Sequence, residues 1–175
     1  YLDNAAVNIT AGGNIEIHGT GGGTDTDGSN NNQGVYGGNN AGLITSTGGN
    51  VLISGTGGVG EDGNRAVLFN DFGKVEATTG SVSFVGDANA AFVDANGNRG
   101  VDITNTEVTA GGALSFTGTG SGNNTSGAND AQGVYFTGTQ TITFGGDLTI
   151  QGTGGGGNDN NRGVQINTGT TITNT

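Results

Sequence analysis

Apolar and polar residues alternate in short segments along the whole chain, which is the pattern of a β-strand with one buried face. In the segment from Gly13 to Gly21, the apolar residues Ile15 and Ile17 alternate with Glu16 and His18. Later segments repeat the pattern, with the apolar pairs Val101/Ile103, Leu114/Phe116, Leu148/Ile150 and Val164/Ile166. The sequence therefore predicts an all-β chain built from short strands.

The segment recurs five times, in its clearest copies as Gly-x-apolar-x-apolar-x-Gly-Thr-Gly. Its first apolar anchors are Ile15, Val51, Val82, Leu114 and Leu148, which recur with an average period of about 33 residues. A second anchor follows a Gly or Ala, at Val35, Val67, Val101, Val134 and Val164. A third lies in Thr-rich segments, at Ile9, Thr45, Val75, Val108, Ile142 and Ile172. Each repeat thus offers a Gly-Thr-Gly strand, a Gly-Val strand and a Thr-rich strand.

The spacing between anchors favours a solenoid over other all-β folds. Two of the three connections hardly vary in length, whereas the one between the Gly-Thr-Gly and Gly-Val anchors differs by several residues from repeat to repeat. Solenoids collect insertions at one edge because their short corners must superpose from coil to coil. We therefore expect a right-handed parallel β-helix of about five coils of about 33 residues, with three short strands per coil. Residues 1–175 would form a single β-solenoid domain or a segment of a longer one, and a low-complexity β-meander is the alternative.

Composition narrows the classes of fold and partner. Only 30% of the 175 residues are hydrophobic and 40 are glycine, so a conventional two-layer core would be underfilled, whereas a narrow repeating core would not. The formal net charge of −11 disfavours nucleic acid and anionic membranes as partners. The chain has no cysteine and therefore no thiolate metal site, and no apolar run is long enough to insert into a membrane.

Two polar columns are expected beside the Gly-Val strands. The residue two before each anchor is always Gln or Arg, at Gln33, Arg65, Arg99, Gln132 and Arg162. This column is either a stripe that binds glycans or anions, or a set of long side chains that cover a corner and hold acidic residues or backbone carbonyls. The preceding positions are Asn32, Asn64, Asn98 and Asn161, interrupted by Ala131. We expect these asparagines to form a structural ladder of stacked amides at a sharp corner with left-handed backbone.

The variable corner holds many of the acidic residues, and calcium is the one cofactor that it could bind. The weak candidates for ligands are Asp25, Asp27, Glu61 and Asp62, because carboxylates are the ligands that calcium prefers. They match no established calcium-loop pattern, and solvated loops are the alternative. His18 is the only histidine and is expected to point outward, as are Tyr36 and Tyr135, which could contact sugar rings or a neighbouring subunit.

The Gly-Thr-Gly element at Gly12 to Gly21 and the Arg-Gly-Val-x-Ile element at Arg162 to Ile166 carry a resemblance to a known family. The sequence resembles the β-helical repeat regions of large bacterial exoproteins, of the filamentous-haemagglutinin-like adhesin or autotransporter passenger type. The resemblance spans the whole chain through composition and period. It implies a secreted, right-handed β-helix that serves as a stalk, adhesin or fibre, at the cell surface or outside the cell.

These observations predict an extracellular structural and adhesive β-solenoid and no enzyme. Because Ile9 and Ile172 share one phase of the repeat, we expect the chain to assemble with itself end to end, and cell-surface glycans are the other expected partner. The alternative is a β-helix that binds or degrades polysaccharides. Such enzymes need clustered carboxylates, whereas the outward strand acids Glu16, Glu76, Asp102 and Glu107 are scattered.

Overall fold

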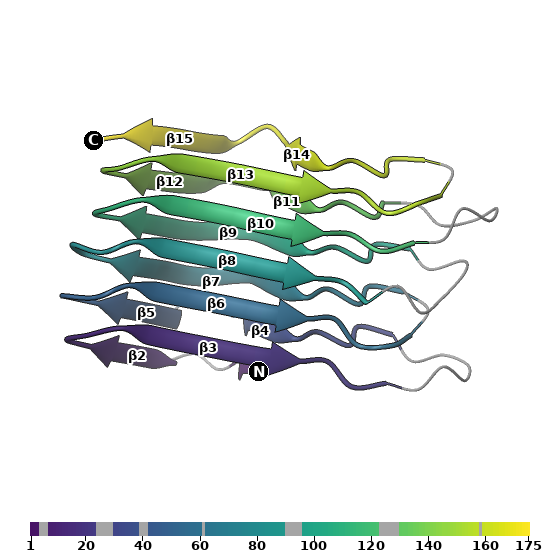
Figure 1. The fold of residues 1–175 in the computed structure, drawn as a ribbon, viewed down its shortest axis with the longest axis horizontal. Coiled ribbons are helices and arrows are strands. Elements are labelled where there is room, and N and C mark those ends of the chain that lie inside the picture. The colour runs from purple at the N-terminus through teal and green to yellow at the C-terminus, as the bar shows by residue number, and fades with distance from the viewer. Residues whose placement is uncertain are drawn as a thin grey trace.

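The fold is known from a computed structural model, which describes residues 1–3, 7–23, 30–38, 42–60, 62–89, 96–122, 130–157 and 159–175. Within these ranges the chain forms β-strands and no helix. The strands pair in parallel and stack as the coils of a β-solenoid (Figure 1). The predicted all-β solenoid, and the period of the repeat on which it was based, are therefore confirmed.

The Gly-Thr-Gly strands form one face of the solenoid, which we call the Gly-Thr-Gly face. Its five parallel strands are β3 (Ile15–Thr20), β6 (Val51–Thr56), β8 (Val82–Asp87), β10 (Leu114–Thr119) and β13 (Leu148–Thr153). The anchors Ile15, Val51 and Val82 lie directly opposite one another in the register, and Leu114 and Leu148 continue the column. Four turns of the chain separate the first strand of this face from the last.

The other strands form two further faces. The Gly-Val face contains β1 (Leu2–Asp3), β4 (Val35–Gly38), the first parts of β7 (Val67–Ala77) and β9 (Val101–Ala110), β11 (Val134–Thr137) and β14 (Val164–Ile166). The Thr-rich face contains β2 (Asn8–Ala11), β5 (Gly42–Ser46), the second parts of β7 and β9, β12 (Gln140–Phe144) and β15 (Thr170–Asn174). Strands β7 and β9 pass from one face to the other at Asp71 and Asn105, whose φ angles are positive, 55° and 45°.

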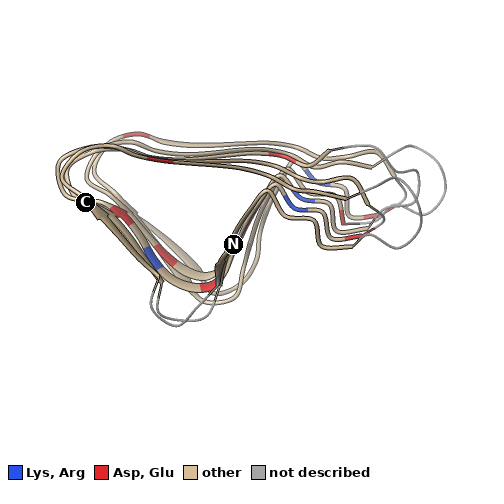
Figure 2. Cartoon of the chain, turned by 90° about the horizontal axis from the view of Figure 1, so that it is seen from below, with Lys and Arg blue, Asp and Glu red and all other residues tan. Residues whose placement is uncertain are grey.

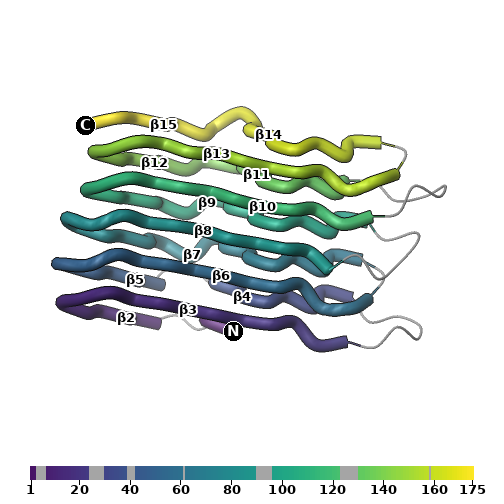
Figure 3. Tube along the Cα trace, in the orientation of Figure 1, coloured from purple at the N-terminus to yellow at the C-terminus, as the bar shows by residue number. Residues whose placement is uncertain are grey.

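The solenoid is right-handed, as predicted. In Figure 1 the strands of the Gly-Thr-Gly face run from left to right in front, and the Thr-rich strands run back behind them while the chain climbs from the N-terminus to the C-terminus. Figure 3 shows the same path as a tube, with the two termini at opposite ends of the stack. Seen along the axis, the coils have a triangular outline (Figure 2).

The second and third anchors stack as expected, with one error. Val67, Val101 and Val134 are paired in register and are fully buried. The third anchor of the second coil, however, is Ile44 and not Thr45, because Ile44 lies opposite Ile9 and Val75. The side chain of Ile44 is buried in the core. The prediction was wrong by one residue, and in a strand one residue moves a side chain to the opposite face.

Aromatic rings fill the middle of the narrow core. Phe84 and Phe116 stack in parallel with their ring centres 5.0 Å apart, and Phe136 packs edge-on against Phe116 at 4.8 Å. Phe69 continues this contact from the Gly-Val face and packs edge-on against Phe72 at 4.9 Å. These five rings come from four strands, β7, β8, β10 and β11. The aromatic contacts therefore join neighbouring coils and opposite faces.

Glycines close one corner of the triangle by bringing two backbones into contact. A Cβ atom on Gly118 would overlap the backbone oxygen of Gly133, and Gly55 faces Ala66 in the same way. The first Gly of each Gly-Thr-Gly element makes this contact, as does Gly86 of the degenerate Gly-Asp-Ala copy; the column is Gly19, Gly55, Gly86, Gly118 and Gly152. Only glycine permits so close an approach. Beyond this contact the coil continues outward as a narrow extension (Figure 2). Each residue of the Gln/Arg column directly precedes the Gly or Ala whose backbone makes the contact.

Candidate functional site

The Gln/Arg column is the sequence-predicted feature that the fold assembles most completely. Its members are stacked through their backbones: the N–H of Gly34 donates to the carbonyl of Arg65, and the N–H of Ala66 donates to that of Arg99. Gly100 and Gly133 make the same bond to Gln132 and Arg162. The column follows the corner beside the Gly-Val face, as the repeat predicts.

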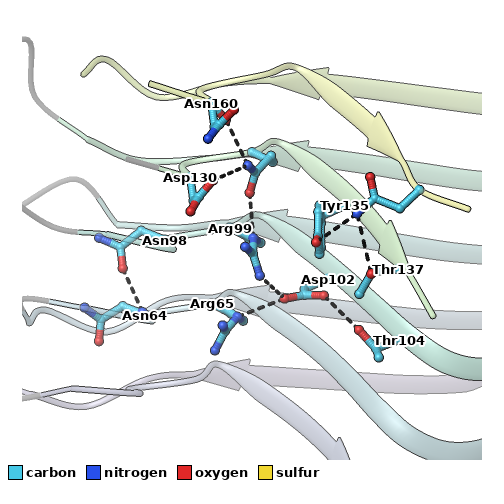
Figure 4. Close-up of polar contacts among 12 residues, drawn as sticks. Asn64, Arg65, Asn98, Arg99, Asp102, Thr104, Asp130, Tyr135, Thr137 and Asn160 are labelled. Atoms are coloured by element: carbon cyan, nitrogen blue, oxygen red, sulfur yellow. Dashed lines mark hydrogen bonds and ion pairs between the residues drawn. The ribbon is translucent and has the colours of Figure 1, made fainter. Parts of the chain in front are cut away.

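A buried carboxylate joins two arginines of this column. Asp102, on β9, has a side chain that is only 4% exposed, and its Oδ2 accepts a hydrogen bond of 2.9 Å from Arg99 (Figure 4). The Nε of Arg65 also lies 2.9 Å from Oδ2, in an ion pair without the alignment of a hydrogen bond. A buried carboxylate requires such partners because its desolvation is costly. Asp102 therefore faces out of the core but is covered by the two arginines.

Arg99 also contacts the next coil. Its Nε donates to Oε1 of Gln132 over 2.6 Å, and its guanidinium carbon lies 4.0 Å from the ring centre of Tyr135, at the distance of a cation–π contact. Gln132 in turn donates to the backbone oxygen of Asn160 over 2.8 Å. These contacts link three successive coils, so Arg99 and Gln132 hold the stack together.

The two ends of the column have local partners. Gln33 accepts a hydrogen bond of 2.8 Å from the hydroxyl of Tyr1, whose ring lies 5.3 Å from that of Tyr36. Arg162 donates to Gln165 over 3.0 Å. Gln132 has partners of both expected kinds, the corner carboxylate of Asp130 over 3.5 Å and the backbone oxygen of Asn160, whereas the carboxylate that joins the arginines is the strand residue Asp102. The i, i+3 spacing of Arg99 and Asp102 was the signal in the sequence that could have identified it.

A groove of about 360 Å³ lies over the Gly-Val face beside this column. Its lining residues are Arg65, Leu68, Asn70, Arg99, Asp102, Thr104, Tyr135 and Thr137. They come from β7, β9 and β11 and from the corner that precedes these strands. The groove therefore runs across three neighbouring coils and contains two of the four basic residues of the chain.

The asparagine column forms a ladder, as predicted. Most of its hydrogen bonds join a side-chain oxygen to a backbone N–H, and not one side-chain amide to another. The Oδ1 of Asn64 accepts from both the backbone N–H and the side chain of Asn32, each over 3.0 Å. The Oδ1 of Asn98 accepts from the backbone N–H of Asn64 over 2.7 Å, and Asn161 accepts from the N–H of Ala131 over 3.0 Å. Each of these side-chain oxygens thus accepts a hydrogen bond from a backbone N–H of the preceding coil. Ala131 keeps such an N–H, so it does not interrupt this contact with Asn161.

The left-handed residues of this corner lie one position earlier than expected. They form their own column of Asn31, Gly63, Gly97, Asp130 and Asn160, with φ angles between 58° and 68°. Asn, Asp and Gly are the residues that tolerate this conformation best. The expectation that the ladder asparagines themselves adopt it was wrong, since none of the four has a positive φ.

Further ladders follow the other corners, and the sequence reasoning missed them. Asn50 donates its backbone N–H to Oδ1 of Asn14 over 2.9 Å, and Ser81 donates to Oδ1 of Asn50 over 2.8 Å. At the corner within β7 and β9, Asn105 donates its side-chain amide to Asp71 over 2.8 Å. The recurring Gly-Asn that precedes the first Gly-Thr-Gly strands was the available signal.

Of the calcium candidates, Asp25, Asp27 and Glu61 lie outside the described residues. Asp62 belongs to another ladder: its Oδ1 accepts from the backbone N–H of Asn96 over 2.8 Å and from the Asn96 side chain over 3.1 Å. In the described part of the chain, no group of three or more His, Cys, Asp or Glu side chains is close enough to hold a metal ion. Calcium binding at this corner remains a prediction.

The remaining charged strand residues lie on other faces. His18 points outward, as predicted, 3.6 Å from Glu16. On the Thr-rich face, Lys74 lies 3.0 Å from Glu107 and 3.4 Å from Glu76. Burial acts to lower the pKa of Lys74, but the hydrogen bonds and charges of Glu107 and Glu76 outweigh it and raise the pKa above its ordinary value. Glu76 and Glu107 are not opposite each other in the register, because Glu107 is opposite Lys74.

The chain matches no protein-family model, no curated protein and no solved structure. Among the described residues, no helix has the length and hydropathy of a membrane span.

Proposed function

We propose that this chain is a structural segment of an extracellular, adhesin-type surface protein, with no catalytic role. The proposal rests on the hydrogen bonds of the polar side chains at the corners, which run along the axis of the solenoid from one coil to the next. At every corner described above, an Asn or Asp side chain accepts or donates a hydrogen bond that joins it to the neighbouring coil. Such ladders stabilise the stack along its axis, which is what a stalk or rod requires.

The likeness of the Gly-Thr-Gly and Arg-Gly-Val elements to bacterial exoprotein repeats supports the extracellular location. Those repeats form secreted β-helices that act as stalks, adhesins or fibres. The fold by itself does not specify a function. The two kinds of support, ladders along the axis and resemblance in the repeat, agree on a structural role at a cell surface.

The contacts of the strand carboxylates favour this role over the alternative of a polysaccharide-degrading enzyme. Glu76 and Glu107 share Lys74, and Asp102 is covered by Arg65 and Arg99. A glycosidase needs a proton-donating carboxylic acid and a second carboxylate on either side of one bond of the substrate. Among the described strand residues, these carboxylates are instead paired with the basic side chains beside them.

A polysaccharide panel tests the absence of catalysis. Neutral and acidic polysaccharides would be incubated with the purified chain, and newly formed reducing ends would be measured. We expect no release above a heat-denatured control. Release that saturates with substrate and disappears in Glu107→Gln or Asp102→Asn would contradict the proposal, because it would assign one of these carboxylates to catalysis.

End-to-end assembly is a further part of the proposal. At the C-terminal end, Val164 and Ile166 are 37% and 47% exposed, and at the other end β1, β2 and β3 have open edges within the described chain. Strands with open edges recruit other strands. If β1 and β2 of one copy pair with β14 and β15 of another, Ile9 lies over Ile172 and continues the core column.

The junction would be incomplete on one face. The Gly-Val and Thr-rich faces each have six levels of strand in the described chain, but the Gly-Thr-Gly face has five. Strand β3 of one copy would then stand two strand spacings, about 10 Å, from β13 of the other. Sedimentation and electron microscopy across concentrations test this assembly. Filaments that grow with concentration are expected, and single particles at high concentration would contradict it.

A further inference from the structure

The groove on the Gly-Val face has a floor and a wall that come from different columns of the repeat. The floor is formed by outward residues of three adjacent strands, Leu68, Asp102 and Tyr135, which lie opposite one another in the register. Arg65 and Arg99 form the wall, at the corner that precedes β7 and β9. The groove therefore lies between the outward face of the Gly-Val strands and the corner that precedes them.

The groove carries a local positive charge on an acidic protein. Two arginines share the single carboxylate of Asp102, which leaves one positive charge in excess. Asp102 cannot serve a ligand because its side chain is only 4% exposed. Arg99 is occupied by Asp102, Gln132 and Tyr135. Among the described residues, Arg65 contacts Asp102 through Nε alone, so its two terminal nitrogens are directed to no other carboxylate.

The other lining groups indicate what kind of ligand fits. Asn70, Thr104 and Thr137 line the groove with amide and hydroxyl groups, and the Thr104 hydroxyl donates to Asp102 over 3.4 Å. Leu68 is only 7% exposed and adds a small apolar area to the floor. The ring of Tyr135 already carries the Arg99 guanidinium, and its hydroxyl accepts a hydrogen bond of 3.0 Å from Asn167, so the ring offers an edge more readily than a free face. The groove thus combines the guanidinium of Arg65 with polar groups and a limited apolar area. This combination suits a charged sugar better than a neutral sugar that stacks on an aromatic ring.

We propose that this groove binds a saccharide that bears a single carboxylate. The terminal nitrogens of Arg65 take the carboxylate, since the planar guanidinium matches a planar carboxylate in a two-point contact. The sugar ring lies over Leu68, with its hydroxyls toward Asn70 and Thr137. A single carboxylate is favoured over a polyanion because the net charge of −11 repels a strongly charged polymer. This site is independent of the structural role proposed above.

A matched pair of ligands tests the proposal on the unaltered protein. Binding of a disaccharide with one terminal glucuronate would be measured by isothermal titration calorimetry, beside the methyl ester of the same disaccharide. We expect the acid to bind and the ester to bind at least about tenfold more weakly, because esterification removes the charge-assisted hydrogen bonds. Equal binding of the two, or no binding of either, would overturn the proposal. Equal binding of a sulfated disaccharide would also overturn it, since the site would then accept any anion.

A matched pair of variants locates the site. Arg65→Gln removes one positive charge from the groove, and Lys74→Gln removes the same charge from the Thr-rich face. We expect Arg65→Gln to weaken binding of the acid about tenfold or more and Lys74→Gln to leave it unchanged, with thermal melts verifying that both variants fold. Equal effects of the two variants would show that overall charge, and not the groove, controls binding. If Arg65→Gln does not fold, chemical-shift changes confined to Leu68, Asn70 and Thr137 on titration of the wild-type protein decide the location, and changes elsewhere would overturn it.

Discussion

The backbone N–H of Asn64 donates to the side-chain Oδ1 of Asn98 in the next coil over 2.7 Å, and both residues are almost fully buried. The backbone N–H groups of Gly63 and Ala66 at this corner donate to carbonyls of the next coil, whereas that of Asn64 donates to a side chain. A buried donor that is left without a partner costs free energy, so this side chain stabilises a part of the chain that regular β pairing does not reach.

Replacing this acceptor is expected to destabilise the solenoid. Asn98→Ala leaves the N–H of Asn64 buried without an acceptor, and we expect the free energy of unfolding to fall by about 1–3 kcal/mol. Chemical denaturation would measure the loss. The control is Asn8→Ala in the exposed part of β2, which should change stability by less than about 0.5 kcal/mol. Equal stability of the two variants would show that the ladder contributes nothing.

The glycine contact predicts that two Gly→Ala substitutions have unequal effects on stability. Gly118→Ala places a methyl group against the backbone of Gly133, so the two backbones must separate, and we expect a loss of about 3 kcal/mol or more. Gly13→Ala is the matched control because a Cβ at Gly13 meets nothing within 4 Å. Thermal melts of the two variants measure the difference, and Gly118→Ala should melt at the lower temperature. A Gly118→Ala protein that melts with the Gly13→Ala protein would refute the close approach of the two segments.

The core column predicts the largest effect. Val101 is fully buried and lies between Val67 and Val134, so Val101→Asp buries a charge without a partner. We expect a loss of more than about 4 kcal/mol, with unfolding of several coils. Thr117→Asp, at an exposed position of β10, introduces the same charge outside the core and should be tolerated. Circular dichroism on heating distinguishes the two, and a normal melt of Val101→Asp would reject the register.

Calcium binding at the acidic corner has a thermodynamic signature. If Asp25, Asp27, Glu61 and Asp62 hold the ion, added calcium must raise the melting temperature by mass action, and chelation must lower it again. Magnesium at equal concentration is the control for general screening of the net charge of −11. A melting temperature that does not respond to calcium, or responds equally to magnesium, would leave these residues as solvated or ladder side chains.

The phase of the repeat could be read from the sequence because the core accepts only apolar side chains at fixed intervals. The columns through Ile15 and through Val67 therefore appear directly as a regular recurrence of apolar residues. Thr45 was misplaced because the weaker Thr-rich strand has Leu43, Ile44 and Thr45 in succession, and alternation alone does not choose among them. The choice of Ile44 comes from its contacts with neighbouring coils, which no single strand contains.

The site was harder to predict than the fold. The Gln/Arg column follows from the repeat, but the burial of Asp102 depends on the simultaneous approach of Arg65 from one coil and Arg99 from its own. The groove depends further on residues of three neighbouring coils, which are brought together by the closed coil and not by any one segment. The sequence pattern predicts which residues share a column. It does not predict how far the side chains of that column are buried.

The central claim, a stack of coils that bears tension along its axis, is tested most directly by pulling on it. The termini lie at opposite ends of the stack (Figure 3), so a single molecule held at Tyr1 and Thr175 is loaded across every coil. We predict resistance that breaks in discrete steps, each lengthening the chain by about 110 Å, the extended length of one coil, or a multiple of it. Asn98→Ala should lower the force of these steps. Smooth extension without steps, at the force of an unfolded chain, would contradict the account.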